Sequence, residues 1–389
     1  MIAPEPFFQP RGTPFSEYYR IKCLTELGHT VDLVTYHIGD DVDIPGLKII
    51  RAPRVPGIND IKIGPSLEKI PLDAALFFKS WEVAAAGNYD AIHSHEEGGL
   101  IAVFLSRLYG LPHVYDMHSS LPDQLSTFRF TKSRLIRWAF DWLEDTVLKA
   151  SDAVIAICPS LVEKAKSIEP NAHLTLIENV AESHEVDNVT KEELAKLEKD
   201  LDFDNKKIIL YIGTFETYQG LGMLLEACAG LFKNRDDALL LMVGGRPNQV
   251  EEIKAKADDL GIAQQCRFTG MVPHSEVPGF LKVADVLVSP RRYGDNTPLK
   301  IYSYLRSGTP IVATNLWTHT QVLNEDVAVL TEAQPKAIAE GIAQILDDRE
   351  LGKRLAKAAF RLSETQYSYS RYVEKTRMVY DHIERVING

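Results

Sequence analysis

Two arginines and a lysine stand near the end of a predicted strand in the stretch ADVLVSPRRYGDNTPLKIYSYLRSGTPIVAT, residues 284–314. The apolar run in this stretch ends just before Arg291 and Arg292, which places both side chains in a strand-end loop. Thr297 suits a helix N-cap and Pro298 the first helical position, so we expect a helix to begin there. Basic side chains and the N–H groups of a helix start attract anions. The segment predicts a diphosphate site built without a metal ion; the alternative is a surface loop with solvated arginines.

Two other loops place glycine and threonine between a strand and a helix. Gly12 and Thr13 precede the first helix, and Gly213 and Thr214 follow a strand in the second half. A glycine at a helix entrance lets backbone N–H groups approach an anion closely, although a simple turn explains either loop alone. The repetition of this design indicates that both loops face one ligand. The second loop lacks the GxGxxG spacing of a nicotinamide-binding dehydrogenase, because Gly213 and Gly220 are too far apart.

Three histidines, His93, His95 and His118, follow predicted strands and lie close in sequence to Glu96, Glu97 and Asp116. Such a cluster raises the possibility of a metal site. We expect the HxH spacing to point His93 and His95 to opposite faces of a strand, so that they do not bind one ion together. For these two, a buried structural role and a site role are equally good interpretations. His118 lies just past a strand, where it is expected to donate to a sugar hydroxyl or a leaving-group oxygen.

Two acidic triplets also resemble metal-binding sequences, DVD at 41–43 and part of DLDFD at 200–204. Both lie in loop or linker sequence, so we interpret them as solvated charge, and no metal is predicted.

Short β-branched runs alternate with longer amphipathic stretches, which is typical of parallel sheets covered by helices. Expected strands in the first half are 31–36, 47–51, 91–94, 113–115, 153–157 and 174–178, and in the second half 208–212, 239–243, 266–268, 286–289, 310–313 and 327–330. Only three residues precede the first loop, so the opening strand is shorter than usual or lacks preceding residues. The pattern predicts an α/β protein of two doubly wound domains.

The charged stretch 186–207 contains few large apolar residues and is expected to be a linker. It separates a first domain, 1–185, from a second domain, 208–366. Sheets of this kind bind ligands at the carboxyl ends of their strands, which is where the loops described above lie.

The composition restricts the class of protein and its partners. Hydrophobic residues make up 45% and charged residues 25%, a balance typical of soluble globular proteins. No apolar run approaches the ~20 residues of a membrane span, so a cytoplasmic protein is expected. The net charge of −11 argues against a nucleic-acid partner. Four cysteines without metal-ligand spacing predict buried free thiols.

The stretch 128–149 combines basic and aromatic residues. One interpretation is an amphipathic element that lies on an anionic membrane, at the inner face of the cell membrane, and presents a lipid-linked acceptor. The other is a helix that packs against its own domain.

Six segments together resemble family 4 glycosyltransferases of GT-B fold, over nearly the whole chain. They are PRGTP (10–14), HSHEEGG (93–99), YDMHSSLP (115–122), ILYIGTFETYQG (209–220), RFTGMV (267–272) and GDNTPLKIYSYLRSGTPIVAT (294–314). The resemblance implies two tandem Rossmann-like domains that face each other across a cleft, the first completed by the C-terminal helix 367–389. It also implies a retaining transferase that uses a nucleotide sugar, a carbohydrate or lipid-linked acceptor, and no metal or other cofactor.

The resemblance also implies roles for individual residues. His118 and Asp295 are expected to orient the donor sugar as the catalytic pair. Gly213 and Thr214 would line the diphosphate, and Val272 would lie near the base. The remaining donor-binding candidates are Gly12, Thr13, Arg246, Arg291, Arg292, Asn296, Thr297, Pro298, Leu299, Lys300 and Ser303.

The chain departs from the family pattern at four positions. Many members carry glutamates where this chain has Asp295 and Ser303, and one serine hydroxyl cannot replace the two acceptor oxygens that grip a ribose. Members often carry Arg and Lys where this chain has Thr214 and Gln219. Other cations are expected to compensate, namely Arg246, Arg291, Arg292 or Lys300. The alternatives are a non-catalytic GT-B binding module and a nucleotide-sugar epimerase.

Overall fold

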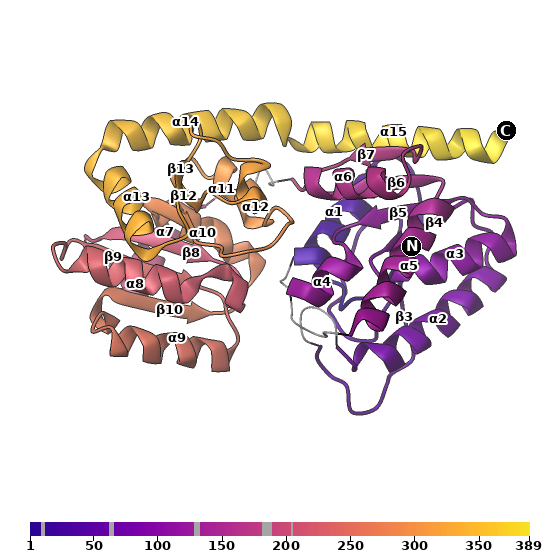
Figure 1. Ribbon diagram of the computed structural model, residues 1–389, viewed down its shortest axis with the longest axis horizontal. Coiled ribbons are helices and arrows are strands. Elements are labelled where there is room, and N and C mark those ends of the chain that lie inside the picture. Colours follow the sequence, from indigo (N-terminus) through magenta and orange to yellow (C-terminus); the bar gives the residue numbers. More distant parts are fainter. Residues whose placement is uncertain (9–11, 62–65, 128–132, 181–188, 204) are drawn as a thin grey trace. The chain divides into compact units, whose positions relative to one another are not determined.

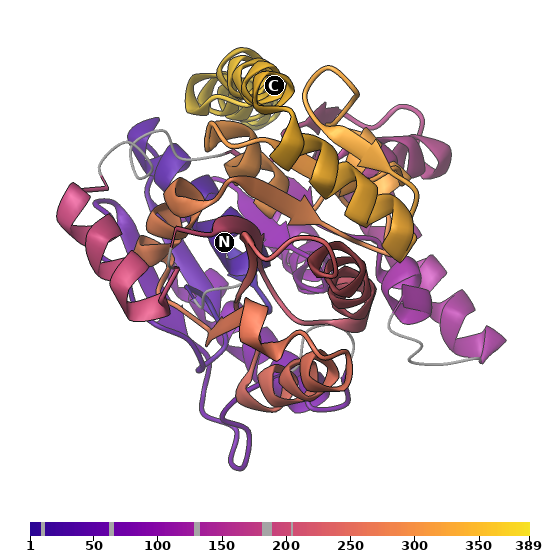
Figure 2. The ribbon, with the colours of Figure 1, turned by 90° about the vertical axis from the view of Figure 1, so that its left-hand side faces the viewer.

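The computed structural model describes residues 1–8, 12–61, 66–127, 133–180, 189–203 and 205–389. The chain divides into two compact units. Unit 1 comprises Met1–Glu178 and Tyr372–Gly389, and unit 2 comprises Asn179–Arg371. Each unit contains one parallel sheet with helices on both faces (Figures 1 and 2). The predicted α/β architecture of two doubly wound domains is therefore confirmed.

The sheet of unit 1 has the strand order β3-β2-β1-β4-β5-β6-β7, and every pair is parallel. Its strands are β1 (Ile2–Ala3), β2 (Val31–Thr35), β3 (Leu47–Arg51), β4 (Ile92–His95), β5 (His113–Met117), β6 (Ala153–Ala156) and β7 (Leu174–Leu176). The very short β1 lies in the middle, because Ile2 pairs with Val34 on one side and with Ser94 on the other. This strand of two residues is shorter than usual.

The helices of unit 1 cover both faces of this sheet. They are α1 (Gly12–Glu26), α2 (Lys69–Ala86), α3 (Gly98–Tyr109), α4 (Leu121–Thr127), α5 (Arg134–Ala150), α6 (Pro159–Ile168) and most of α15 (Tyr369–Asn388). The helix α15 buries Tyr372, Thr376, Val379 and Ile383. This spacing of three and four residues puts the four side chains on one face of the helix.

The sheet of unit 2 has the order β10-β9-β8-β11-β12-β13 and is also parallel. Its strands are β8 (Lys207–Ile212), β9 (Ala238–Val243), β10 (Cys266–Gly270), β11 (Val286–Ser289), β12 (Ile311–Thr314) and β13 (Val329–Thr331). Alternate residues of β8 enter opposite cores: Ile209 and Tyr211 pack on one face, Ile208 and Leu210 on the other. Such two-sided burial explains the nearly continuous apolar runs of these strands.

Helices of unit 2 fill both of these cores. They are α7 (Lys191–Leu201), α8 (Leu221–Phe232), α9 (Pro247–Asp259), α10 (Val277–Val283), α11 (Lys300–Arg306), α12 (Trp317–Thr320), α13 (Pro335–Asp347) and α14 (Arg349–Gln366), with short 3₁₀ turns at Thr217–Gln219, Ala263–Gln265 and His274–Glu276.

Part of the stretch expected to be a linker is folded. Its described residues include α7, which opens with a reciprocal cap: Glu193 N donates to Thr190 Oγ1 at 3.2 Å, and Thr190 N donates to Glu193 Oε2 at 2.8 Å. Leu197 and Leu201, four residues apart, pack on the core of unit 2. The capping sequence TKEE signals this helix start, and the high charge of the stretch obscured it. Residues 186–188 and 204 of the stretch lie outside the described residues.

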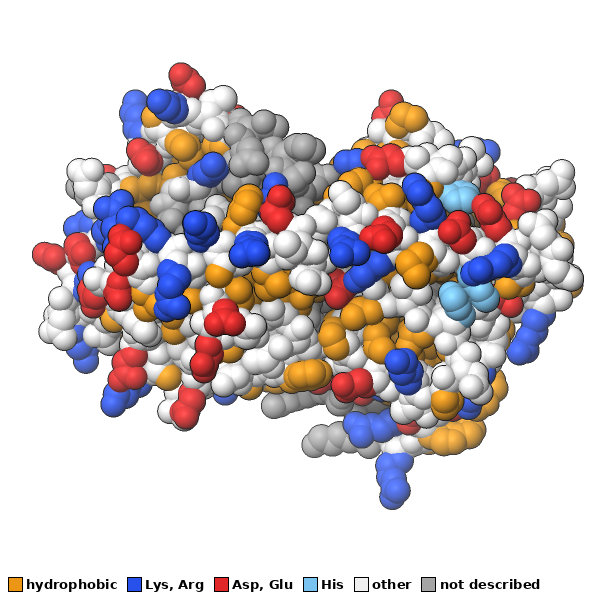
Figure 3. Space-filling view, turned by 90° about the horizontal axis from the view of Figure 1, so that it is seen from above, with side chains coloured by type: hydrophobic (Ala, Val, Ile, Leu, Met, Phe, Trp, Pro, Cys, Tyr) orange, Lys and Arg blue, Asp and Glu red, His pale blue; other side chains and the backbone are white. Residues whose placement is uncertain are grey.

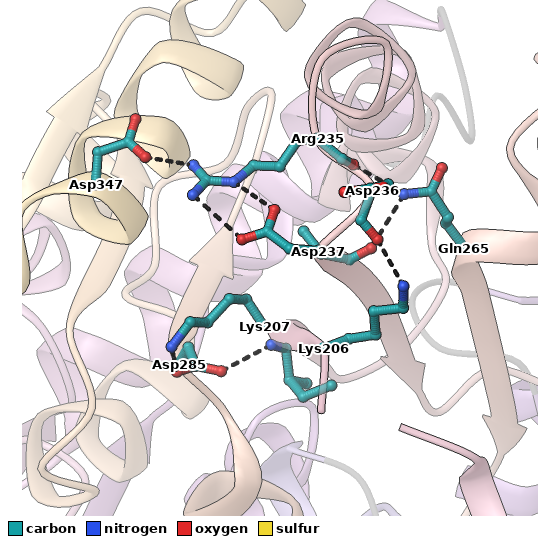
Figure 4. A network of polar contacts seen from close by, with 10 residues as sticks. Lys206, Lys207, Arg235, Asp236, Asp237, Gln265, Asp285 and Asp347 are labelled. Atoms are coloured by element: carbon teal, nitrogen blue, oxygen red, sulfur yellow. Dashed lines mark hydrogen bonds and ion pairs between the residues drawn. The ribbon is translucent and has the colours of Figure 1, made fainter. Parts of the chain in front are cut away.

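A polar network holds the amino-terminal edge of the sheet of unit 2 (Figure 4). Arg235 Nε donates to Asp237 Oδ1 at 2.9 Å and Arg235 Nη1 to Asp347 Oδ1 at 2.7 Å. Asp285 Oδ2 accepts from the backbone N of Ile208 at 2.9 Å. These charges pin the starts of β8, β9 and β11, at the edge of the sheet opposite the strand-end loops.

The surface carries charges of both signs, and the four cysteines lie in the core. The face in Figure 3 carries acidic and basic side chains side by side rather than one basic patch. Cys23, Cys158, Cys228 and Cys266 are buried free thiols, as predicted. In the described part of the chain, no helix combines the length and apolar character required to cross a bilayer.

Candidate functional site

The strand order of unit 2 reverses between β8 and β11, and such a switch point is where doubly wound sheets bind ligands. Lys300 lies there: its Nζ is 3.3 Å from Gln219 Oε1 and 3.8 Å above the ring of Tyr211. Gln219 Nε2 in turn donates to Thr214 Oγ1 at 3.4 Å. A Cβ on Gly213 would stand 2.9 Å from Lys300 Nζ, so glycine leaves room for the lysine. We call Gly213, Thr214, Gln219 and Lys300 the Lys300 group.

This geometry shows which basic residue lies near Thr214 and Gln219, the two positions where family members often carry Arg and Lys. Thr214 and Gln219 carry no charge, but Lys300 reaches the same place from α11. Burial, and after it the charge of Arg291, hold the pKa of Lys300 well below its ordinary value. An anion at this place would supply the counter-charge that the amine lacks.

Arg291 supports the loop that follows β11. Its Nη1 donates to the carbonyl of Asn296 at 2.6 Å and to Thr318 Oγ1 at 2.7 Å. Thr318 Oγ1 also donates to the Asn296 carbonyl at 2.6 Å, and the guanidinium lies 5.0 Å from the ring centre of Tyr218. Arg291 therefore shapes the loop, whereas the neighbouring Arg292 is exposed.

The expected helix start at Thr297 is wrong. The helix α11 begins at Lys300, and Leu299 is its N-cap residue without a side-chain hydrogen bond. Thr297 is buried, with 5% of its surface exposed, and its hydroxyl makes no hydrogen bond to the helix N–H groups. Pro298 is buried too and precedes the helix by two residues. Because α11 has only seven residues, the site depends more on side-chain charge than on the helix dipole.

The other predicted donor-site residues of unit 2 occupy separate elements. Arg246 is the N-cap residue of α9, and its backbone N donates to Gln249 Oε1 at 3.0 Å. Val272 follows β10 and is partly buried, and Ser303 is partly buried on α11. Asp295 is exposed, and its carbonyl accepts from Gln321 Nε2 at 2.6 Å.

In unit 1, His118 follows β5 and is buried, with 5% exposed. Its Nε2 lies 3.2 Å from Asp116 Oδ1 and 3.2 Å from His95 Nδ1. Burial alone would lower the pKa of His118, but Asp116 raises it above its ordinary value, so the imidazole favours the charged form. Gly12 and Thr13 begin α1, and residues 9–11 before them lie outside the described residues.

Asp116 is the centre of a buried cluster. Arg20 Nε donates to Asp116 Oδ2 at 2.8 Å, and His93 Nε2 lies 3.5 Å from the same oxygen. Burial alone would raise the pKa of Asp116, but Arg20 and then His118 hold it well below its ordinary value. We call Asp116, Arg20, His93 and His118 the Asp116 cluster.

The expectation that His93 and His95 point to opposite faces is wrong. Residues two apart on a strand share a face, and the two ring centres lie 4.9 Å apart. Ligand atoms of His93, His95 and Asp116 lie within 4.8 Å of one another, a spacing that could hold a metal ion. Arg20, however, already neutralises the same carboxylate and places a fixed positive charge beside it. We therefore interpret the group as a hydrogen-bonded polar cluster.

Glu96 is a residue to which the sequence analysis gave no role. It follows β4 with a φ of +45°, a strained conformation for a residue other than glycine. Ser119 Oγ donates to Glu96 Oε2 at 2.6 Å. Burial, followed by Glu97, raises the pKa of Glu96 to about 7. The position of an acidic residue directly after a strand could have marked Glu96 as a candidate. The strain of its backbone is visible only in the structure.

Comparison with known proteins identifies the family. The model described as "Glycosyl transferase 4-like domain" matches residues 20–179, and "Glycosyl transferases group 1" matches residues 193–362. Alpha-D-kanosaminyltransferase of Streptomyces kanamyceticus is 24% identical over 306 residues, which cover 75% of this chain and 77% of that relative.

Solved structures agree on the fold. Sucrose-phosphate synthase from Thermosynechococcus elongatus matches with a TM-score of 0.80 at 18% identity and covers 99% of both chains. Anabaena HepE in complex with UDP-glucose matches with a TM-score of 0.74 at 14% identity and covers 98% of both chains. The chain belongs to the family 4-like glycosyltransferases and has the GT-B fold.

Proposed function

We propose that the chain transfers a sugar from a nucleoside-diphosphate donor to a carbohydrate, lipid-linked or small-molecule acceptor. The observation that carries this proposal is the Lys300 group, in which one partly buried lysine meets the strand-end glycine loop at the switch point of unit 2. A diphosphate requires such a counter-charge. The name of the kanosaminyltransferase supports sugar transfer, and the UDP-glucose held by HepE supports a donor of this class.

In this proposal the protein stabilises the departing diphosphate by charge rather than with a metal ion. A bound diphosphate favours the charged form of Lys300, and Arg292 adds an exposed charge nearby in sequence. Preplaced charges of this kind commonly contribute several kcal/mol to catalysis. Asp295 and His118 orient the donor sugar, and Ser303 makes a single contact to the ribose. Retention of configuration follows from the family resemblance.

A binding screen tests the donor and the absence of a metal. We expect one nucleotide sugar among UDP-, GDP- and ADP-linked sugars to raise the melting temperature equally with and without EDTA. At 100 times its dissociation constant, a ligand stabilises the folded state by about 2.7 kcal/mol. Stabilisation that EDTA abolishes would contradict the metal-free site, and no binding by any donor would contradict the whole proposal. NMR of the product anomer tests retention.

The first half of α5 supports an acceptor presented at a membrane surface. Leu135, Trp138 and Trp142 are 72%, 63% and 56% exposed, and their spacing of three and four residues puts them on one helix face. Arg134 and Arg137 are exposed beside them. We propose that this part of α5 binds anionic lipid headgroups. Phe128, Arg129, Phe130 and Lys132 of the expected membrane element lie outside the described residues.

We expect the chain to bind vesicles that contain anionic phosphatidylglycerol at low salt. Replacing Arg134 and Arg137 with alanine should weaken binding by about 30-fold, since each basic residue near such a surface contributes about 1 kcal/mol. Met378→Glu is the control, because Met378 is similarly exposed at 58% but lies on α15. Equal binding to neutral vesicles, or equal loss in the control, would rule out this role for α5.

A further inference from the structure

The two carboxylate oxygens of Asp116 have different partners. Oδ2 contacts Arg20 Nε at 2.8 Å and His93 Nε2 at 3.5 Å, whereas Oδ1 faces His118 Nε2 at 3.2 Å. Asp116 is fully buried and Arg20 is 2% exposed. The groups on Oδ2 therefore fix the rotation of the carboxylate, and this rotation sets which oxygen His118 meets.

The helix α15 holds both groups on Oδ2. Arg20 Nη1 donates to Thr376 Oγ1 at 2.8 Å, and the Arg20 guanidinium lies 4.7 Å from the ring centre of Tyr372. The hydroxyl of Tyr380 lies 2.7 Å from His93 Nδ1. Thr376 is fully buried, so its hydroxyl has no water to replace this contact. Thr376 and Tyr380 of α15 thus each contact a residue that itself contacts Asp116.

We propose that Tyr380 and Thr376 are positioning residues for His118, acting through the Asp116 cluster. Their hydrogen bonds go to Arg20 and His93. Each fixes a neighbour of Asp116, and Asp116 orients the imidazole. The inference rests on the proposed function, because it assumes that His118 contacts the donor sugar during transfer. It adds a task to α15, which otherwise packs as an amphipathic helix on unit 1.

Two variants remove only the hydroxyls, Tyr380→Phe and Thr376→Val. Ile383→Val is the matched control, because Ile383 is 2% exposed on the same helix face and is not part of the cluster. We expect each hydroxyl variant to lower kcat by about 3- to 10-fold, the effect of one hydrogen bond, with the donor KM unchanged. Thr376→Ser keeps the hydroxyl and should restore kcat. A loss of kcat equal to that of Ile383→Val would overturn the proposal.

A second measurement does not depend on activity. The chain has 11 histidines, and nitrogen-15 NMR of the imidazoles can be assigned with a His118→Gln variant. Tyr380→Phe and Thr376→Val should shift the His118 resonances, and Ile383→Val should leave them in place. Unchanged His118 resonances would overturn the positioning role. Shifted resonances in a chain that transfers no sugar would instead overturn the proposed function and leave the link between α15 and His118 standing.

A double-mutant cycle tests whether Tyr380 acts through His118. If Tyr380 acts through His118, Tyr380→Phe should have no further effect on the residual rate of His118→Gln. Multiplicative losses in the double variant would show that Tyr380 acts by another route and would contradict the proposal.

Discussion

Replacing Arg20 with methionine is expected to lower the free energy of unfolding of unit 1 by about 3–5 kcal/mol, the cost of breaking a buried ion pair. The variant leaves Asp116 charged, fully buried and without its strongest partner. It also removes the Arg20 contacts to Thr376 and the ring of Tyr372. Methionine keeps the apolar stem of the side chain but is shorter than arginine, so lost packing adds to this cost.

Tryptophan fluorescence measures this effect in unit 1 alone. Trp81, Trp138 and Trp142 lie in unit 1, and Trp317 lies in unit 2, so a Trp317→Phe background reports on unit 1. Lys149→Met is the control, because its ion pair with Asp145 is 51% and 41% exposed. Exposed pairs of this kind contribute about 0.3–0.5 kcal/mol. A loss in Arg20→Met as small as in the control would contradict the structural role of the ion pair.

The same variant should change the acid sensitivity of unit 1. The folded-state pKa of Asp116 lies well below its unfolded value of about 3.9, so its stabilising effect is present above that pH. The effect is lost only as the pH falls through the lower folded value. Without Arg20 the pKa of Asp116 rises, and acid unfolding should begin at a higher pH than in the unmodified chain.

Replacing Lys300 with methionine is expected to lower kcat/KM for the donor by about 100- to 1,000-fold, the usual effect of removing one preplaced charge from a transition state. Lys300 is the basic residue of the Lys300 group, and the nearby Arg291 is engaged with Asn296 and Thr318. The variant should be as stable as the original or more so, because methionine needs no counter-charge when buried. Lost activity without lost stability then identifies a functional role.

The pH dependence of donor binding gives an independent readout. Burial holds the pKa of Lys300 well below its ordinary value, and the charge of a bound diphosphate should raise this pKa again, so proton uptake on binding is expected. Donor affinity should therefore fall as the pH rises through this lowered pKa. Calorimetry in buffers of different ionisation enthalpy should detect proton uptake, and Lys300→Met should abolish it. Lys282→Met, at an exposed lysine of α10, is the control. A donor affinity that does not change with pH would contradict the role assigned to Lys300.

The strands were predictable because their signal is local. Runs such as Ile208–Ile212 and Val286–Ser289 are short, apolar and β-branched, and both are strands in the structure. The start of α11 was not predictable, because burial of Thr297 overrides its capping tendency. The helix α7 was missed although Thr190 and Glu193 form a recognisable cap.

The candidate site was predictable only in part. Strand-end position identified Gly213, Lys300 and His118 as candidates, since the carboxyl ends of parallel strands collect ligand-binding loops. The sequence left four candidates for the basic residue beside Gln219. The path of α11 decides among them and places Lys300 there. The contact between Arg20 and Thr376 joins positions 356 residues apart, and no local pattern reports it.

The two segments of unit 1 are separated in the sequence by the whole of unit 2. During synthesis the ribosome therefore makes Arg20, His93 and Asp116 long before Thr376 and Tyr380. At about 5–20 residues per second, the chain waits roughly 10–40 s between the two segments. Unit 2 can close its two cores in that interval, because all of its strands are then available. Unit 1 is thus begun before unit 2 and completed after it. Until α15 has been made, the buried charged groups of unit 1 lack their contacts to Thr376 and Tyr380.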